Sequence, residues 1–213
     1  MPPVNQEILD LFISRAQAAG AVVQQLPTRA AALQYVLDVC AQKAPCELLA
    51  DEDVEKGPDG PNRVPTRVQK VVAAPDVDEA DFATLSAACQ AQGIRCLRHG
   101  LRQHLAGIDV GLTTARLAVA TTGTCLAVGD EEDTRLAGMI SEIHIMLLSP
   151  SAIYADLPAI AGPLRQRLAE RPGSYTTLIT GPSRTADIER VGAIGVHGPL
   201  QLHVILLEDA HAQ

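Results

Sequence analysis

Residues 180–199, TGPSRTADIERVGAIGVHGP, bring together the residue types that proteins use to hold anions. Gly181 permits backbone angles that other residues resist, and the letters after it predict a short helix over residues 184–194. The first N–H groups of such a helix would point at a bound anion. Arg184 adds a guanidinium whose paired donors match a carboxylate or a phosphate. We therefore interpret this stretch as an anion-binding turn for a small carboxylate or a phosphate-bearing ligand.

The polar residues of this predicted helix could serve either the ligand or the helix itself. Ser183 or Thr185 would cap its first turn. Asp187 would stabilise the positive end of the helix or hold Arg184 in place. Asp187 and Glu189 are two residues apart and would point to different helix faces, which makes them a poor acid–base pair. Because any well-capped helix carries the same letters, a purely structural role stays open.

The histidines are further candidates. His197 and Gly198 lie on a turn before the last apolar stretch, where an imidazole could titrate, donate to an oxyanion or lock the turn. His144 and His203 lie within apolar stretches and are ambiguous between a functional role and a place in a sheet. Because these three histidines are scattered along the chain, the sequence predicts no metal site.

A second turn, TTGT at residues 121–124, could complete an anion site with its hydroxyls and with the N–H groups around its glycine. A simple hairpin turn would explain the same letters. The candidate ligand-binding residues are Gly181, Ser183, Arg184, Thr185, Asp187, His197, Gly198, Thr122, Gly123 and Thr124.

These residues must be positioned by alternating helices and strands. Apolar periodicity and capping residues predict helices over residues 5–20, 28–43, 78–93 and 151–170, the last one interrupted near its prolines. Short apolar runs predict strands at 46–50, 68–74, 94–100, 141–150, 174–180 and 200–209, with a further pair joined at the TTGT turn. The Pro- and Gly-rich residues 55–67 predict a loop.

This alternation predicts an α/β fold, a single-domain sandwich with a mostly parallel or mixed sheet. The length of 213 residues fits one domain spanning residues 1–213, with a helical N-terminal part over residues 1–45. No apolar run reaches the length of a membrane span, and no secretory signal is apparent, so we expect a cytoplasmic protein.

Charge and cysteine usage narrow the classes of partner and cofactor. The formal net charge of −8 and the lack of a basic block argue against a nucleic-acid partner. The five cysteines form no CxxC pair, so they match neither a disulfide framework nor a zinc or iron–sulfur site. Each lies in an apolar stretch and is interpreted as a small core residue: Cys40, Cys46, Cys89, Cys96 and Cys125.

The second half of the chain resembles a known family. The stretches GLTTARLAVATTGTCLAV, RLAGMISEIHIMLLSPSAI, GPSRTADIE and GVHGPLQLHVILL are similar to the signature of the LUD-domain family, over residues 105–213. The chain departs from that pattern at Thr121–Thr122, where relatives often carry an acid. It departs again at Thr134–Arg135, where relatives often carry a Gly-Arg pair.

This resemblance implies a fold shared with sugar-phosphate isomerases and CoA-transferases. It also implies a role in bacterial oxidation of L-lactate to pyruvate, alongside two iron–sulfur partner proteins. Longer family members carry cysteine clusters, so this chain resembles the short member that has no cofactor of its own.

Three functions stay open at this point. The chain could be a non-redox subunit that binds a small anionic metabolite or helps to assemble the complex. It could instead be an isomerase or a CoA-transferase-like enzyme that uses a strand-end carboxylate, for which Glu142, Asp187 and Glu189 are candidates. A regulatory or scaffolding domain is the third alternative.

Overall fold

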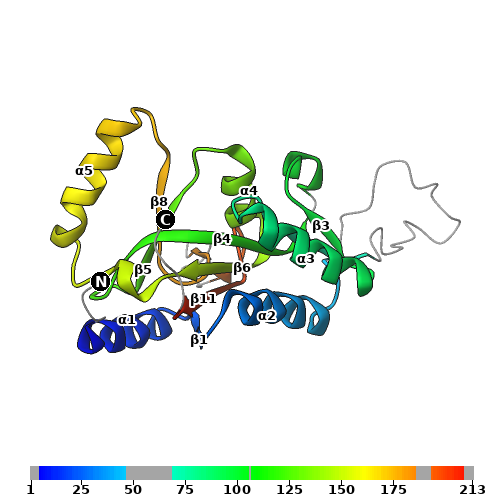
Figure 1. Ribbon diagram of the computed structural model, residues 1–213, viewed down its shortest axis with the longest axis horizontal. Coiled ribbons are helices and arrows are strands. Elements are labelled where there is room, and N and C mark those ends of the chain that lie inside the picture. Colours follow the sequence, from blue (N-terminus) through cyan, green and yellow to red (C-terminus); the bar gives the residue numbers. More distant parts are fainter. Residues whose placement is uncertain (1–4, 47–68, 106, 186–192, 209–213) are drawn as a thin grey trace, which may run out of the picture.

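A parallel sheet runs through the computed structural model in the strand order β1-β11-β6-β4-β2-β3 (Figure 1). The structure describes residues 5–46, 69–105, 107–185 and 193–208. Strands β4, β6 and β11 are almost entirely buried, as expected for parallel strands covered on both faces. In sheet order the strands are β1 (Val22–Leu26), β11 (Gln201–Leu207), β6 (Ser141–Leu148), β4 (Ile108–Val119), β2 (Val71–Ala73) and β3 (Arg95–Leu97).

Strand β4 continues beyond the parallel sheet and starts a second, antiparallel part. From Ala115 to Val119 it pairs antiparallel with β5 (Thr124–Val128), with a shift in register between Ala115 and Leu117. Strand β5 pairs antiparallel in turn with β8 (Thr176–Ile179), which forms a β5–β8 ribbon. The predicted strand pair joined at TTGT is therefore confirmed, and so is the mixed α/β sheet.

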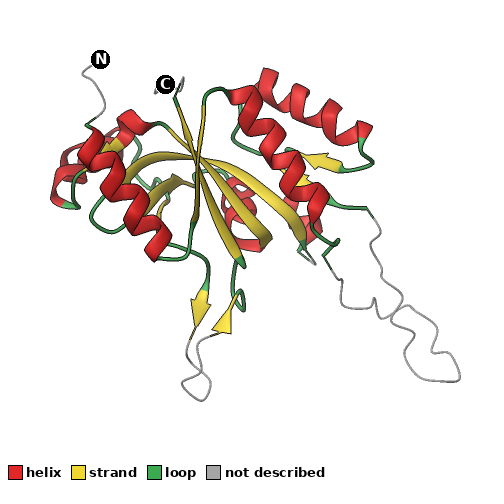
Figure 2. Ribbon diagram, turned by 90° about the horizontal axis from the view of Figure 1, so that it is seen from below, coloured by secondary structure: helices red, strands yellow, loops and turns green. Residues whose placement is uncertain are grey.

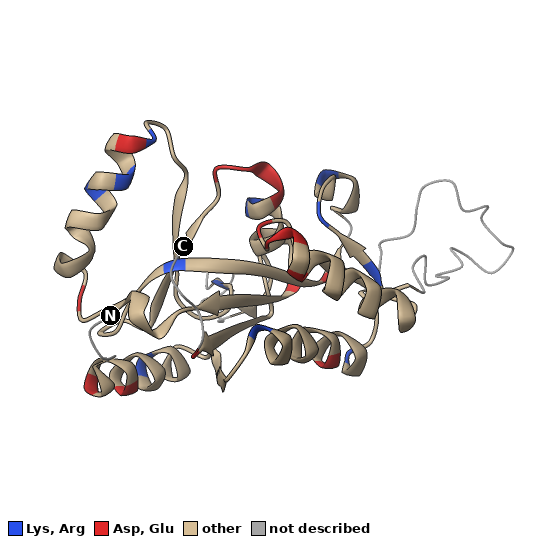
Figure 3. Cartoon of the chain, in the orientation of Figure 1, with Lys and Arg blue, Asp and Glu red and all other residues tan. Residues whose placement is uncertain are grey.

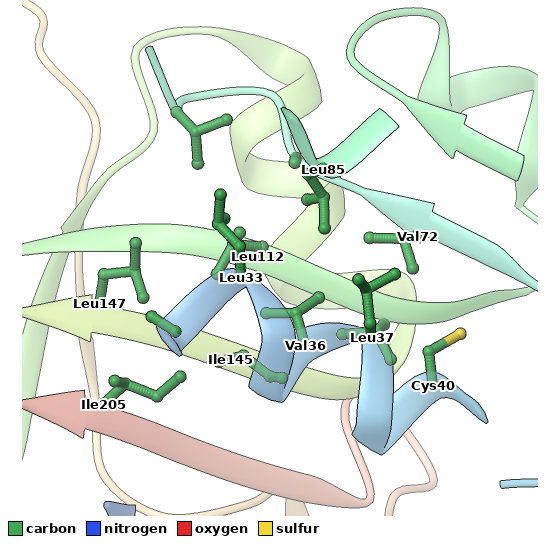
Figure 4. Packing of buried hydrophobic residues seen from close by; sticks show 14 of the residues in the cluster. Leu33, Val36, Leu37, Cys40, Val72, Leu85, Leu112, Ile145, Leu147 and Ile205 are labelled. Carbon is green, nitrogen blue, oxygen red and sulfur yellow. The ribbon is translucent and has the colours of Figure 1, made fainter. Parts of the chain in front are cut away.

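Helices cover both faces of the sheet (Figure 2). Helices α2 (Arg29–Gln42) and α3 (Glu79–Ala91) pack against one face and share a core cluster with β2, β4, β6 and β11. Figure 4 shows this packing, with Leu33, Val36 and Leu37 of α2 against the strands. Helix α1 (Gln6–Ala18) packs against the other face.

Helix α4 (Glu132–Ile140) lies close to β4. A Cβ on Gly111 would lie 2.1 Å from the carbonyl oxygen of Ala137, so only glycine allows this approach. The sequence did not predict α4, although two acids in its first turn match the helix dipole.

The predicted helices begin where their capping residues stand. The side chains of Asn5, Thr28 and Asp78 accept hydrogen bonds from the first turns of α1, α2 and α3. The predicted helix over residues 151–170 is confirmed only in its second half, as α5 (Ala161–Glu170). Before it lie 3-10 turns η2 (Pro150–Ala152) and η3 (Pro158–Ile160) and strand β7 (Ile153–Tyr154), and η1 (Leu101–His104) follows β3.

The predicted helix over residues 184–194 is wrong at both ends. Residues Arg184–Thr185 form β9 and residues Ala193–Ile194 form β10, and the two pair antiparallel. This short ladder projects from the rim of the sheet in Figure 2. The residues between the two strands, including Asp187 and Glu189, lie outside the described residues.

The reason for this correction is pairing across the segment. The N–H of Gly195 donates to the carbonyl of Ser183 at 2.9 Å, and the N–H of Ser183 donates to the carbonyl of Pro199 at 3.0 Å. Gly195 has a positive φ of 77°, and it follows a strand rather than capping a helix. The backbone groups around Ser183 are thus satisfied by partners more than ten residues away.

Two further differences concern the N-terminal part. The prediction that residues 1–45 are helical is wrong over β1, which lies between α1 and α2 and forms one edge of the parallel sheet. The predicted strand at residues 46–50 lies almost wholly outside the described residues. Among the described helices, none is both long enough and apolar enough to cross a membrane.

Charged residues lie mostly on helices and at the ends of strands (Figure 3), and Asp109 is the buried one among the residues that the structure describes. Lys43, after α2, lies 2.7 Å from Asp109 of β4 and 3.1 Å from Glu142 of β6. The carboxylate of Asp109 is fully buried and also accepts the N–H groups of Val71 and Cys46. Burial would raise the pKa of Asp109, but the hydrogen bonds from Lys43 and from these amides outweigh it and hold the pKa below its usual value.

We expect Asp109→Asn to lower the free energy of unfolding by about 3 kcal/mol at pH 7, because it leaves the buried ammonium of Lys43 with less compensation. This difference in the free energy of unfolding should shrink as the pH falls below about 4, the pKa of an aspartate in the unfolded chain, because the wild-type carboxylate then becomes protonated as well. Urea unfolding measures both effects. The exposed Asp38→Asn change on α2 should cost less than about 0.5 kcal/mol, and equal costs for the two variants would contradict a stabilising role for the buried Asp109–Lys43 pair.

Candidate functional site

A cavity of about 360 Å³ lies between α4, the β5–β8 ribbon and one face of the parallel sheet. Its wall is completed by two turns that come together, residues 180–183 after β8 and residues 197–199 before β11. The carbonyl of Pro199 holds these turns together by accepting the N–H of Ser183. The cavity has the size and the mostly apolar lining of small-molecule sites.

His144 of β6 is the most buried polar group of the cavity lining, with 1% of its surface exposed. Its Nε2 lies 2.8 Å from the hydroxyl of Thr113 on the adjacent strand β4. Burial lowers the pKa of His144 to about 4, so the imidazole is neutral at pH 7. A Cβ on Gly138 of α4 would lie 3.2 Å from the ring, which shows how closely the helix passes.

Arg135 of α4 supplies a fixed positive charge to the lining. Its Nη1 donates to the carbonyls of Gly129 and Asp130, and its guanidinium lies 5.3 Å from the ring centroid of Tyr175. A Cβ on Gly129 would lie 2.5 Å from the Arg135 side chain. The guanidinium is therefore held by backbone carbonyls on one side and by an aromatic face on the other.

The carboxylate of Asp130 anchors the segment that carries Tyr175. It accepts the hydroxyl of Ser174 at 2.7 Å and the N–H of Tyr175 at 3.0 Å, and it pairs with Arg167 at 2.9 Å. The Ser174 hydrogen bond, together with the other donors, lowers the pKa of Asp130. Asp130 therefore fixes the start of β8 beside α4 but does not line the cavity itself.

Four of the ten residues predicted from the sequence line this cavity: Gly181, Ser183, His197 and Gly198. Gly181 has a φ of +67°, and a Cβ there would lie 2.3 Å from the carbonyl oxygen of Ala19, so the turn needs glycine. His197 is exposed at the edge of the cavity. His203 lies elsewhere, with Nδ1 3.0 Å from the hydroxyl of Tyr35.

Arg184 and Thr185 lie outside the cavity lining. The exposed guanidinium of Arg184 donates from Nη2 to the carbonyl of Ala19 at 2.8 Å, at the C-terminal end of α1. This contact satisfies a carbonyl at the negative end of the helix. Thr185 belongs to the β9–β10 ladder.

The turn of Thr122, Gly123 and Thr124 packs against α1 and does not line the cavity. A Cβ on Gly123 would lie 2.3 Å from the backbone nitrogen of Ala16. The hydroxyl of Thr124 lies 2.7 Å from that of Thr122 and 2.7 Å from that of Thr180, which does line the cavity. The turn thus reaches the cavity edge through a chain of hydroxyls.

Local turn signals in the sequence do not identify Arg135 or Tyr175. Arg135 stands in a helix that the sequence did not predict, and its neighbour Tyr175 is forty residues away in the chain. One signal in the sequence could have pointed to the cavity: Thr113 and His144 are polar residues that stand within apolar strands. Among the described residues, no group of three His, Cys, Asp or Glu side chains could hold a metal ion.

The candidate carboxylate Glu142 also lies outside the cavity lining. Its Oε2 accepts the thiol of Cys46 at 3.1 Å and lies 3.1 Å from the ammonium of Lys43. Burial, followed by the hydrogen bond to Glu142, raises the pKa of Cys46 to about 12, so this thiol stays protonated at neutral pH.

With the fold and the cavity described, comparison with known proteins assigns the family. A family model for the LUD domain matches residues 9–207, and the chain belongs to this family. An uncharacterised protein of Neisseria meningitidis is 34% identical over 107 residues, which cover 49% of this chain and 44% of that protein. Lactate utilization protein C of Shouchella clausii is 32% identical over 102 residues, covering 47% of this chain and 44% of the relative.

Lactate utilization protein C of Bacillus subtilis is 30% identical over 103 residues, covering 47% of this chain and 43% of that protein. Each match thus spans less than half of the curated relative. A crystal structure of a DUF162 family protein from Deinococcus radiodurans superposes with a TM-score of 0.57 at 20% identity, covering 95% of this chain and 97% of that one. The likeness to this crystal structure supports the fold.

The neutral state of His144 predicts a pH-dependent stability. As the pH falls from 6.5 towards 4, the unfolded chain binds a proton at this histidine that the folded protein does not bind, so stability falls by up to roughly 3 kcal/mol. We expect His144→Gln, which keeps a hydrogen-bonding group opposite Thr113, to flatten this part of the profile. Urea unfolding between pH 7 and 4 measures it.

The exposed His99→Gln variant serves as the control and should keep the wild-type slope. If His144→Gln and wild type show the same slope between pH 6.5 and 4, then His144 is not held neutral by burial.

Proposed function

We propose that this LUD-domain protein serves in bacterial L-lactate utilisation as a non-redox subunit, and that it binds a small carboxylate in the cavity beside α4. Family membership and the relatives named lactate utilization protein C support the pathway. Because those relatives match over less than half of their length, their role is extended to this chain only as a proposal.

The charge of the cavity lining carries the binding proposal. Among the described lining residues, Arg135 is the only Lys or Arg, and none is an Asp or Glu. A single cation in a partly apolar cavity attracts negative charge more strongly than it would in water. The nearby carboxylate of Asp130 already pairs with Arg167 and Ser174, outside the lining.

The polar groups around Arg135 suit a carboxylic acid that also carries a hydroxyl or a keto oxygen on the neighbouring carbon. A guanidinium binds a carboxylate through two parallel hydrogen bonds. The hydroxyls of Thr134, Thr177 and Ser183 and the neutral imidazole of His144 also line the cavity, and each can donate or accept. A 2-hydroxy or 2-oxo acid such as lactate or pyruvate would use both kinds of partner.

A carboxylate fits this lining better than a phosphate. A phosphate monoester carries a charge of about −1.5 to −2 at pH 7, whereas the described lining offers one guanidinium. A single carboxylate charge is balanced by Arg135 alone. Of the two ligand classes left open by the sequence, we therefore propose the carboxylate.

The enzyme alternative requires a carboxylate nucleophile or base at the ligand. Glu142 is engaged with Lys43 and Cys46 and lies outside the lining, and no described lining residue is acidic. These placements favour binding over covalent acyl transfer in this cavity.

Arg135→Gln should weaken binding of lactate or pyruvate by about 10- to 100-fold, because a hydrogen-bonded charge contributes about 1.5–3 kcal/mol. Isothermal titration calorimetry measures the affinities, and the exposed Arg165→Gln variant of α5 controls for net charge. Arg184→Ala should bind like wild type. If Arg135→Gln binds the acids as tightly as wild type, or if only Arg184→Ala loses affinity, then the anion does not bind in the cavity.

The partner proposal rests on the family resemblance, which pairs such a chain with two iron–sulfur proteins. We expect the chain to co-purify with the two iron–sulfur proteins of such a pathway when the three genes are expressed together. Size-exclusion chromatography with iron analysis measures the complex. Elution of every component at its separate position, at micromolar concentrations, would contradict a stable assembly.

A further inference from the structure

The volume of the cavity exceeds that of a three-carbon acid, and this difference favours a larger ligand. Lactate and pyruvate each have six non-hydrogen atoms, which occupy at most about 180 Å³ at about 30 Å³ per water-sized group. The cavity measures about 360 Å³, so one such molecule would leave at least about half of it unfilled. Unfilled apolar space forfeits contacts that a longer ligand would make.

We propose that the cavity binds a 2-hydroxy or 2-oxo monocarboxylic acid with a bulky apolar side chain, best represented by an aromatic one. This inference rests on the proposed binding of a carboxylate at Arg135. Phenyllactate and phenylpyruvate have twelve non-hydrogen atoms, which take up to about 360 Å³ on the same scale. A single such molecule therefore fits within the cavity and fills up to twice the share that a three-carbon acid fills.

The walls away from the polar groups are apolar and come from four elements. Ala127 and Val128 of β5, Leu178 of β8, Met139 of α4 and Leu202 of β11 all line the cavity. An apolar side chain placed among them would be removed from water at about 25 cal/mol for each Å² buried. A three-carbon acid has only one methyl group with which to use these walls.

The mouth of the cavity supports the same conclusion. Met139, Tyr175 and Leu178 line the cavity yet keep 56%, 51% and 49% of their surface exposed. A ligand with an apolar body would cover part of this surface. Tyr175 stands beside Arg135, so an aromatic ring attached close to the bound carboxylate could pack against the tyrosine ring.

The charge of the lining sets the other limit on the ligand. The described lining offers Arg135 as its one permanent cation, so a second carboxylate or a phosphate would enter without a charged partner. The class is therefore a monoanion with one polar end and one apolar end.

Calorimetric titration of the full chain with lactate, phenyllactate, pyruvate and phenylpyruvate tests the proposal. We expect each phenyl compound to bind at least about tenfold more tightly than its three-carbon counterpart. Leu178→Ala should then weaken phenyllactate binding about five- to tenfold and change lactate binding less than twofold. The matched control is Leu168→Ala, an exposed leucine of α5 outside the lining.

Each outcome is decisive. If lactate and pyruvate bind as tightly as the phenyl compounds, or if Leu178→Ala leaves phenyllactate binding unchanged, the apolar-side-chain proposal fails while carboxylate binding stands. If none of the four acids binds at millimolar concentration, both proposals fail.

Discussion

The change of β4 from parallel pairing with β6 to antiparallel pairing with β5 is the constraint on which the cavity depends. Through Thr114 the strand pairs in parallel with β6 and β2, and from Ala115 onward it pairs antiparallel with β5, with a shift in register between Ala115 and Leu117. One strand thus belongs to both the parallel sheet and the β5–β8 ribbon. A shift of this kind bends a strand and increases its twist. The ribbon, α4 and the sheet face are held in their positions around the cavity by this shared strand.

The second constraint is the way the acids are paired. Asp109 and Glu142 are paired with Lys43 at the amino ends of β4 and β6, and Asp130 is paired with Arg167 and hydrogen-bonded to Ser174. Arg135 is instead held by neutral carbonyls and an aromatic ring, so its charge is not cancelled by an adjacent acid in those contacts. This arrangement leaves the described cavity lining positively charged in a protein whose net charge is −8.

Much of the fold was predictable because its signals are local. Capping residues such as Thr28 mark helix starts, and apolar runs such as residues 141–148 mark buried strands. The prediction of a helix after Ser183 was wrong because the backbone of Ser183 pairs with Gly195 and Pro199. No local sequence pattern encodes these contacts. Turn signals located Gly181 and His197 at the cavity. Arg135 was named only within a departure from the family pattern and not as a ligand-binding residue, because its place depends on α4 packing beside the distant start of β8.

A crystal structure of the protein with saturating phenylpyruvate tests the central claim most directly. The carboxylate is predicted to lie within hydrogen-bonding distance of the Arg135 guanidinium, with the ring between β5, β8 and α4. Electron density for the acid beside Arg184 or at the turn of residues 121–124, with the cavity beside α4 holding only water, would contradict it.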